Sequence, residues 1–114
     1  MSHRVDLAYL EDIFLAARKI RLYTTGMTKT TFTADSRTQD AVLRQLSVIG
    51  EAAASISAEF QKAVEGVQWR GVVAFRNLVV HQYWQVDLDR VWGIVKKDLP
   101  ELVRKLKLAG AGRR

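Results

Sequence analysis

Apolar residues recur along the chain at intervals of three and four, the period of an amphipathic helix. Within residues 6–23 the recurring positions are Leu7, Leu10, Phe14, Ala17 and Ile20. Gly26 follows shortly after them, and glycine is a common helix terminator. The pattern predicts a first helix over residues 6–23 that ends before Gly26.

A second stripe follows a polar segment. The composition of residues 26–37, GMTKTTFTADSR, predicts a loop. Asp35 or Ser36 is expected to cap the next helix, because such side-chain oxygens accept hydrogen bonds from its free N–H groups. That helix has one apolar stripe, formed by Val42, Leu46, Ile49, Ala53, Ile56 and Phe60.

Two further helices are predicted in the second half. The segment from Trp69 to about Gln82 is rich in β-branched residues, which also fit a buried strand, but its length and helical surroundings favour a helix. The last helix starts near Asp87 as its N-cap, and Pro100 either kinks it or begins a new turn after Leu99. Its apolar stripe consists of Leu88, Trp92, Val95, Leu99, Leu102 and Leu106.

Together these elements predict an all-α fold, a four- to five-helix antiparallel bundle. The 114 residues, 48% of them hydrophobic, are enough to bury a core and suit one domain over residues 1–109. Residues 110–114, GAGRR, are expected to form a short, frayed basic tail.

The composition indicates in which cellular compartment the protein is expected. The chain has no cysteine, which excludes disulfides and thiolate metal sites. We expect no membrane span, because no apolar run approaches the necessary length. The N-terminal residues are charged every few positions, unlike the apolar core of a signal peptide. A cytoplasmic protein is the simplest interpretation.

The net charge of +6 lies wholly in the last 25 residues, where eight Lys/Arg face two Asp/Glu over residues 90–114. Such a run can attract the phosphates of a nucleic acid. It can equally be a solvated helix end, where cations suit the macrodipole, and for this run alone that second interpretation is favoured.

Residues 76–83, RNLVVHQY, place polar groups in the most apolar part of the chain. Arginine is almost never fully buried unless it is paired, so Arg76 needs an acid, a wet cleft or a phosphate as its partner. On an ideal α-helix Asn77 and His81 share a face, whereas Arg76 and His81 lie about 140° apart. Two copies of the helix, related by a symmetry axis, could therefore complete a site that one copy leaves incomplete.

These groups suit metal-independent cleavage of an RNA phosphodiester. The ribose 2′-OH would attack, His81 would move a proton, and Arg76 would hold the phosphoryl oxygens. A metal site is poorly supplied, since the only other histidine is His3, and no cofactor is expected. A structural interpretation stays open, in which Arg76 pairs with an internal acid such as Glu51 and His81 caps a helix end.

The spacing of Arg76, His81 and Tyr83 matches the Arg-x4-His-x-Tyr motif, and the chain resembles HepT-type toxins of the HEPN superfamily. Further blocks resemble the family in the same order: residues 9–13 (YLEDI), 48–53 (VIGEAA), 69–77 (WRGVVAFRN), 86–92 (VDLDRVW) and 98–102 (DLPEL). The resemblance covers nearly the whole chain.

The resemblance implies an α-helical, metal-independent ribonuclease that dimerises or assembles further, so that the motifs of two subunits meet. By position it implies Arg76 and His81 as the catalytic pair and Asn77 as a polar residue that supports them. Glu51 falls in the GEA block, and we expect it to support Arg76.

The resemblance also implies a partner. HepT-type toxins pair with an MntA-like nucleotidyltransferase antitoxin that adds AMP to the motif tyrosine, here Tyr83. Bulk and negative charge near Arg76 would then exclude RNA. The alternative from a different class is a catalytically silent helical adaptor that binds a nucleotidyltransferase or RNA.

Overall fold

The computed structural model describes residues 3–78 and 86–109. Every regular element in these residues is helical, as predicted for an all-α fold. The elements are α1 (His3–Tyr23), α2 (Lys29–Thr33), α3 (Ser36–Ser55), α4 (Ala58–Ala63), α5 (Trp69–Val73), η1 (Ala74–Asn77), α6 (Leu88–Gly93), η3 (Ile94–Asp98) and α7 (Leu99–Leu108).

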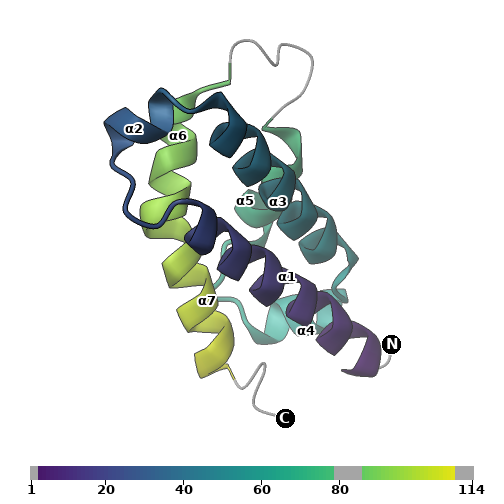
Figure 1. Cartoon of the computed structure of the whole chain (residues 1–114). Coiled ribbons are helices and arrows are strands. Elements are labelled where there is room, and N and C mark those ends of the chain that lie inside the picture. The colour runs from purple at the N-terminus through teal and green to yellow at the C-terminus, as the bar shows by residue number, and fades with distance from the viewer. Residues whose placement is uncertain (1–2, 79–85, 110–114) are drawn as a thin grey trace.

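The chain runs up and down through the bundle. Helices α1 and α3 pack side by side and run antiparallel, α5 and η1 lie behind α3, and α6 to α7 form the last arm (Figure 1). The short helices α2 and α4 lie in the connections. No helix of the described residues is long and apolar enough to span a bilayer.

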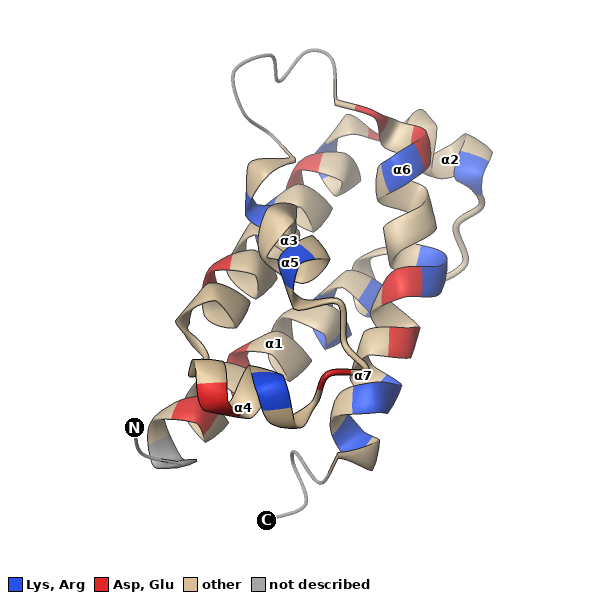
Figure 2. Cartoon of the chain, turned by 180° about the vertical axis from the view of Figure 1, so that it is seen from behind, with Lys and Arg blue, Asp and Glu red and all other residues tan. Residues whose placement is uncertain are grey.

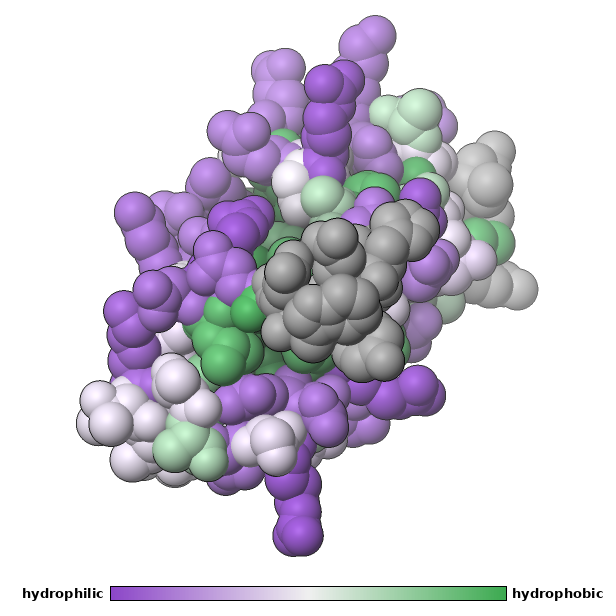
Figure 3. Space-filling view, turned by 90° about the horizontal axis from the view of Figure 1, so that it is seen from above, coloured by the Kyte–Doolittle hydropathy of each residue, from purple (hydrophilic) through white to green (hydrophobic). Residues whose placement is uncertain are grey.

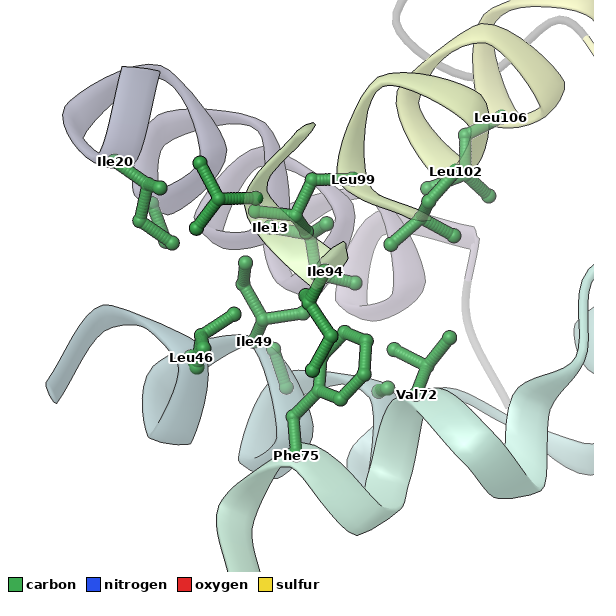
Figure 4. Packing of buried hydrophobic residues seen from close by; sticks show 14 of the residues in the cluster. Ile13, Ile20, Leu46, Ile49, Val72, Phe75, Ile94, Leu99, Leu102 and Leu106 are labelled. Carbon is green, nitrogen blue, oxygen red and sulfur yellow. The ribbon is translucent and has the colours of Figure 1, made fainter. Parts of the chain in front are cut away.

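The predicted apolar stripes face one core. Side chains of α1, α3, α5 with η1, and the last arm meet there (Figure 4). On the part of the upper face that grey atoms leave open, polar residues lie outermost and apolar ones lie deeper (Figure 3). Each large aliphatic side chain buried in this way contributes about 1.5–3 kcal/mol. The side chains with almost no exposure include Leu10, Ile13, Ile20, Leu46, Ile49, Val91, Ile94 and Leu106.

The loop predicted over residues 26–37 is wrong in part, because it contains α2. Thr28 and Thr31 form a reciprocal capping box at its start. Phe32 is fully buried, and its ring lies 5.1 Å from that of Trp92. This anchored aromatic residue stabilises a five-residue helix that polar composition alone did not indicate. Gly26 does follow the end of α1, at a positive φ of 77°.

The second stripe is divided between two helices. Helix α3 ends at Ser55, and Phe60 belongs to α4. Ser57 caps α4 by accepting from the Phe60 N–H at 3.1 Å. The buried Asp6 carboxylate accepts from both the N–H and the hydroxyl of Ser57, at 2.9 and 2.7 Å. These hydrogen bonds fix the break between the helices and tie it to α1.

The third predicted helix, Trp69 to about Gln82, is wrong in form. Over residues 69–78, the part that the structure describes, it is α-helical to Val73 and then tightens into the 3₁₀ turn η1. The Leu78 N–H accordingly donates to the carbonyl of Phe75, three residues back, at 3.3 Å. Such tightening is common at helix ends. The angle expected between Arg76 and His81 assumed an unbroken α-helix. Arg76 instead lies on a 3₁₀ turn, and His81 lies outside the described residues.

The last arm begins as predicted, with the Asp87 carboxylate accepting from the Arg90 N–H at 3.1 Å. Pro100 lies in the first turn of α7, which agrees with the predicted new turn after Leu99. Just before it, residues Ile94–Asp98 form a π-helical segment, in which the Leu99 N–H donates to the carbonyl of Ile94. Proline has no N–H to donate, and the wider turn accommodates this before α7 continues.

Asp35 is the N-cap of α3, as predicted, and its contribution should depend on pH. The Thr38 N–H, and then the Thr38 hydroxyl, hold the pKa of Asp35 below its usual value of 3.8. The native state therefore favours the ionised carboxylate, so the stabilisation is present above pH 3.8 and is lost as pH falls through the lowered pKa. Thermal melts should show Asp35→Ala below wild type at neutral pH, with the gap narrowing in acid.

Asp35→Asn is the control, because asparagine also caps helices but does not titrate. Its melting temperature should stay near that of wild type at neutral pH, without the acid-dependent loss. An Asp35→Ala gap that is the same at every pH would contradict the role of the ionised carboxylate.

Candidate functional site

Arg76 lies on η1 at the edge of a groove between α1, α3 and η1, here called the Arg76 groove. Its volume is about 590 Å³. Tyr9, Leu43, Val48 and Phe75 supply apolar or aromatic lining, and further lining residues are Asp12, Asp40, Arg44, Glu51 and Arg76. Charges of both signs therefore surround an apolar floor.

The partner that Arg76 was predicted to need is Glu51 on α3. The Arg76 Nη1 donates to Glu51 Oε1 at 3.4 Å, and the two side chains are 37% and 66% exposed. Ion pairs this exposed contribute only about 0–1 kcal/mol to stability. The pair therefore orients Arg76 without locking it, and leaves its other donors open to the groove.

Gly50 sets how closely η1 approaches α3. A Cβ on Gly50 would lie 2.6 Å from the Arg76 nitrogen, 2.9 Å from the Arg76 Cβ and 2.9 Å from the Val73 carbonyl oxygen. Two of these atoms are backbone and cannot rotate away. The absent side chain thus allows the Arg76 backbone to lie directly against α3, one residue before Glu51.

The structure brings together some of the predicted site residues. Arg76 and Glu51 are in contact, and Asn77 is exposed on η1 but does not line the Arg76 groove. His81 and Tyr83 lie outside the described residues. Within the described part of the chain, no group of three His, Cys, Asp or Glu side chains could share a metal ion.

Sequence reasoning missed Gly50 and the rest of the groove. Gly50 interrupts an otherwise regular helical stripe, and an isolated helical glycine is a sign of close packing. Arg44 and Asp40 showed no such signal, because exposed charges on a helix usually indicate only a solvated face.

The basic segment predicted over residues 90–114 does not form one surface where the structure describes it (Figure 2). Arg104 approaches Glu101 at 4.0 Å, and the Lys105 ammonium donates to the Gly66 carbonyl at 2.9 Å. Lys96 lies over the Trp92 ring, 5.5 Å from its centre. Three cations of this segment thus have separate local contacts.

Comparison with known proteins identifies the family. The family described as "Ribonuclease HepT-like" matches residues 13–109. The chain belongs to this family. The resemblance to HepT-like HEPN ribonucleases drawn from the motifs is therefore confirmed.

Two relatives of this HepT-like chain match along almost their whole length. "Putative RNase MJ1380" of Methanocaldococcus jannaschii is 32% identical over 108 residues, covering 95% of this chain and 99% of the relative. "Probable ribonuclease HepT" of Thermococcus cleftensis is 36% identical over 99 residues, covering 87% and 90%. No solved structure gives a significant match.

The close contact at Gly50 in this HepT-like chain predicts whether replacing this glycine by alanine raises or lowers the stability of the protein. Without a clash, alanine in mid-helix would stabilise the protein by up to about 1 kcal/mol relative to glycine. With the clash, we expect Gly50→Ala to destabilise it by about 1–3 kcal/mol. Chemical denaturation measures both the sign and the size of the change.

Gly93→Ala is the matched control, because Gly93 is also helical but a Cβ there would meet nothing within 4 Å. It should be neutral or stabilising. If Gly50→Ala stabilised the protein as much as Gly93→Ala, the contact between α3 and η1 would not be tight in solution.

Proposed function

We propose that this HepT-like protein is a metal-independent endoribonuclease in which Arg76 and His81 act on the RNA backbone. The observation that supports it most directly is the exposed Arg76 guanidinium, paired loosely with Glu51 at the edge of a groove. A guanidinium in this position can exchange a carboxylate for a phosphate, because both offer oxygens to the same fork of donors.

The proposed reaction needs only groups of the protein and the RNA. The ribose 2′-OH attacks the adjacent phosphorus and loses its proton to a histidine. The bond from phosphorus to the 5′-oxygen breaks, and that oxygen takes a proton from a second histidine. The products are a 2′,3′-cyclic phosphate and a free 5′-OH. Arg76 stabilises the charge that develops on the phosphoryl oxygens.

We further propose that two subunits share the site. Two proton transfers call for two histidines, and one chain has one motif histidine, His81. The apolar floor of the Arg76 groove offers a surface on which a second copy can pack with its own Arg76 nearby. Glu51 holds Arg76 in place in each subunit before RNA arrives, and Asn77 supports the site as a neighbouring polar group on η1.

The test is cleavage of RNA by the purified protein in EDTA. We expect His81→Ala to lower the rate by about 10²–10⁴-fold, the usual contribution of a general acid or base. Arg76→Ala should lower it by about 10²–10³-fold. Gel analysis of a labelled RNA measures the rates, and thermal melts of the same samples report folding.

Arg70→Ala is the control, because Arg70 is an exposed arginine nearby that does not line the Arg76 groove. It should cleave like wild type. Unfolding of Arg76→Ala would instead favour a purely structural role for the ion pair. Mixing wild type with an excess of His81→Ala subunits should lower the activity more than dilution alone does if the site is shared, because mixed dimers hold only one His81. Dilution alone is expected if each chain holds a complete site.

We also propose that the protein is the toxin of a toxin–antitoxin pair, silenced at Tyr83 by an MntA-like nucleotidyltransferase. The Tyr83 hydroxyl would attack the α-phosphorus of ATP, form a phosphodiester to AMP and release pyrophosphate. Tyr83 is two residues from His81, so the added phosphate would compete with RNA for the cations of the site.

This switch predicts a selective effect of Tyr83→Phe. Incubated with the nucleotidyltransferase and ATP, wild type should gain the mass of AMP and lose its ribonuclease activity. Tyr83→Phe should gain no mass and stay active. Intact-mass spectrometry and the cleavage assay on the same samples check both. Modification of Tyr83→Phe at another residue would contradict the assignment.

A further inference from the structure

A second groove lies between α1 and the last arm, here called the basic groove. Its volume is about 700 Å³. It shares no lining residue with the Arg76 groove. Whatever binds there can do so without contacting Arg76 or Glu51, so the inference drawn from it is independent of the proposed ribonuclease activity.

The floor of the basic groove consists of two apolar stripes. On α1 the positions are Phe14, Ala17 and Ile20, spaced by three, and on the last arm Val95, Leu99 and Val103, spaced by four. The two stripes face each other across the basic groove, one on α1 and one on the last arm. A third helix could fill it, with an apolar face that anchors at intervals of three and four residues.

The walls of the basic groove are positively charged on both sides. Arg18 and Arg21 stand on α1, and Lys96 and Lys107 on the last arm, all of them exposed. Among the described residues, the lining contains no acidic side chain. None of these four cations forms an ion pair with another described residue. The groove therefore presents uncompensated positive charge along both edges of an apolar floor.

We propose that the basic groove is the docking site for an acidic amphipathic helix of a partner protein. Its apolar stripe would pack on the floor, and Asp or Glu residues on both flanks of the stripe would face the two cationic walls. A second copy of this chain is a poor occupant, because its net charge is +6. Complementary charge of this kind sets specificity and speeds association.

The floor argues against RNA as the occupant. Grooves that bind single-stranded nucleic acid combine cations with aromatic side chains on which bases stack. Of the lining residues in the described part of the chain, Phe14 alone is aromatic, and the rest of the floor is aliphatic. Aliphatic side chains match the leucine and isoleucine face of a helix better than the flat faces of bases.

The experiment uses a labelled synthetic peptide of about 18 residues, or five helical turns. It carries leucine at every third or fourth position and glutamate on both flanks. Fluorescence anisotropy should show saturable binding to the intact protein that weakens as salt is added. A second peptide with lysine in place of glutamate should not bind.

The protein variants locate the site. Arg18→Glu combined with Lys107→Glu reverses one charge on each wall and should weaken peptide binding about tenfold or more, since each pair becomes repulsive. Lys62→Glu combined with Arg70→Glu is the matched control, with the same change in net charge at exposed residues that line neither groove. It should leave the affinity nearly unchanged.

Three outcomes would overturn the inference. One is the absence of saturable binding by the acidic peptide. Another is an equal loss in the control pair, which would mean that only net charge matters. The third is preferential binding of a 2′-O-methyl oligouridylate, which cannot be cleaved, with loss in the groove variant alone. That result would make the groove an RNA subsite instead. RNA cleavage should be the same in the groove variant and wild type.

Discussion

The position of the candidate site depends on a contact that only glycine permits. Helix α3 has a single glycine, and at that point the backbone of Arg76 lies against it, closer than any Cβ would allow. Because Glu51 is the next residue of α3, the same contact places the carboxylate beside the guanidinium. The ion pair is weak and exposed, so backbone packing, rather than the attraction of the charges, determines where Arg76 stands.

Much of the fold could be predicted from the sequence, because long amphipathic helices show their period directly. The stripes of α1, α3 and the last arm, and the caps Asp35 and Asp87, are all present. The helix predictions are wrong where the contacts of a single side chain decide the local structure and the apolar periodicity does not. Phe32 makes a helix out of a polar segment, and the hydrogen bonds of Asp6 to Ser57 end another helix early.

Within the described residues, the pairing of Arg76 was the part of the candidate site that the sequence predicted. A buried-looking arginine required a partner, and Glu51 is that partner. The α-helical angles assumed for the motif depend on a regular backbone, whereas Arg76 and Asn77 lie on a 3₁₀ turn. An isolated helical glycine can signal close packing, but what Gly50 packs against, and the groove around Arg76, depend on tertiary contacts between α1, α3 and η1.

Helix α1 is the element that both grooves share, and it presents a different chemistry to each. Tyr9 and Asp12 near its start line the mixed-charge Arg76 groove, whereas Arg18 and Arg21 near its end form one wall of the basic groove. Its buried positions, Leu10, Ile13 and Ile20, hold the helix in one orientation. One rigid element thus fixes the two surfaces relative to each other.

The pairing of Arg76 with Glu51 has a consequence for which anions the site accepts. Glu51 is a competitor attached to the same chain, so its effective concentration beside Arg76 does not fall when the protein is diluted. An anion that takes the place of the carboxylate on Arg76 has to compete with that local concentration. A single dilute anion would gain little by doing so, whereas a polymer held at several points brings its own high local concentration. A carboxylate in this position would therefore favour chains of phosphates over free ions.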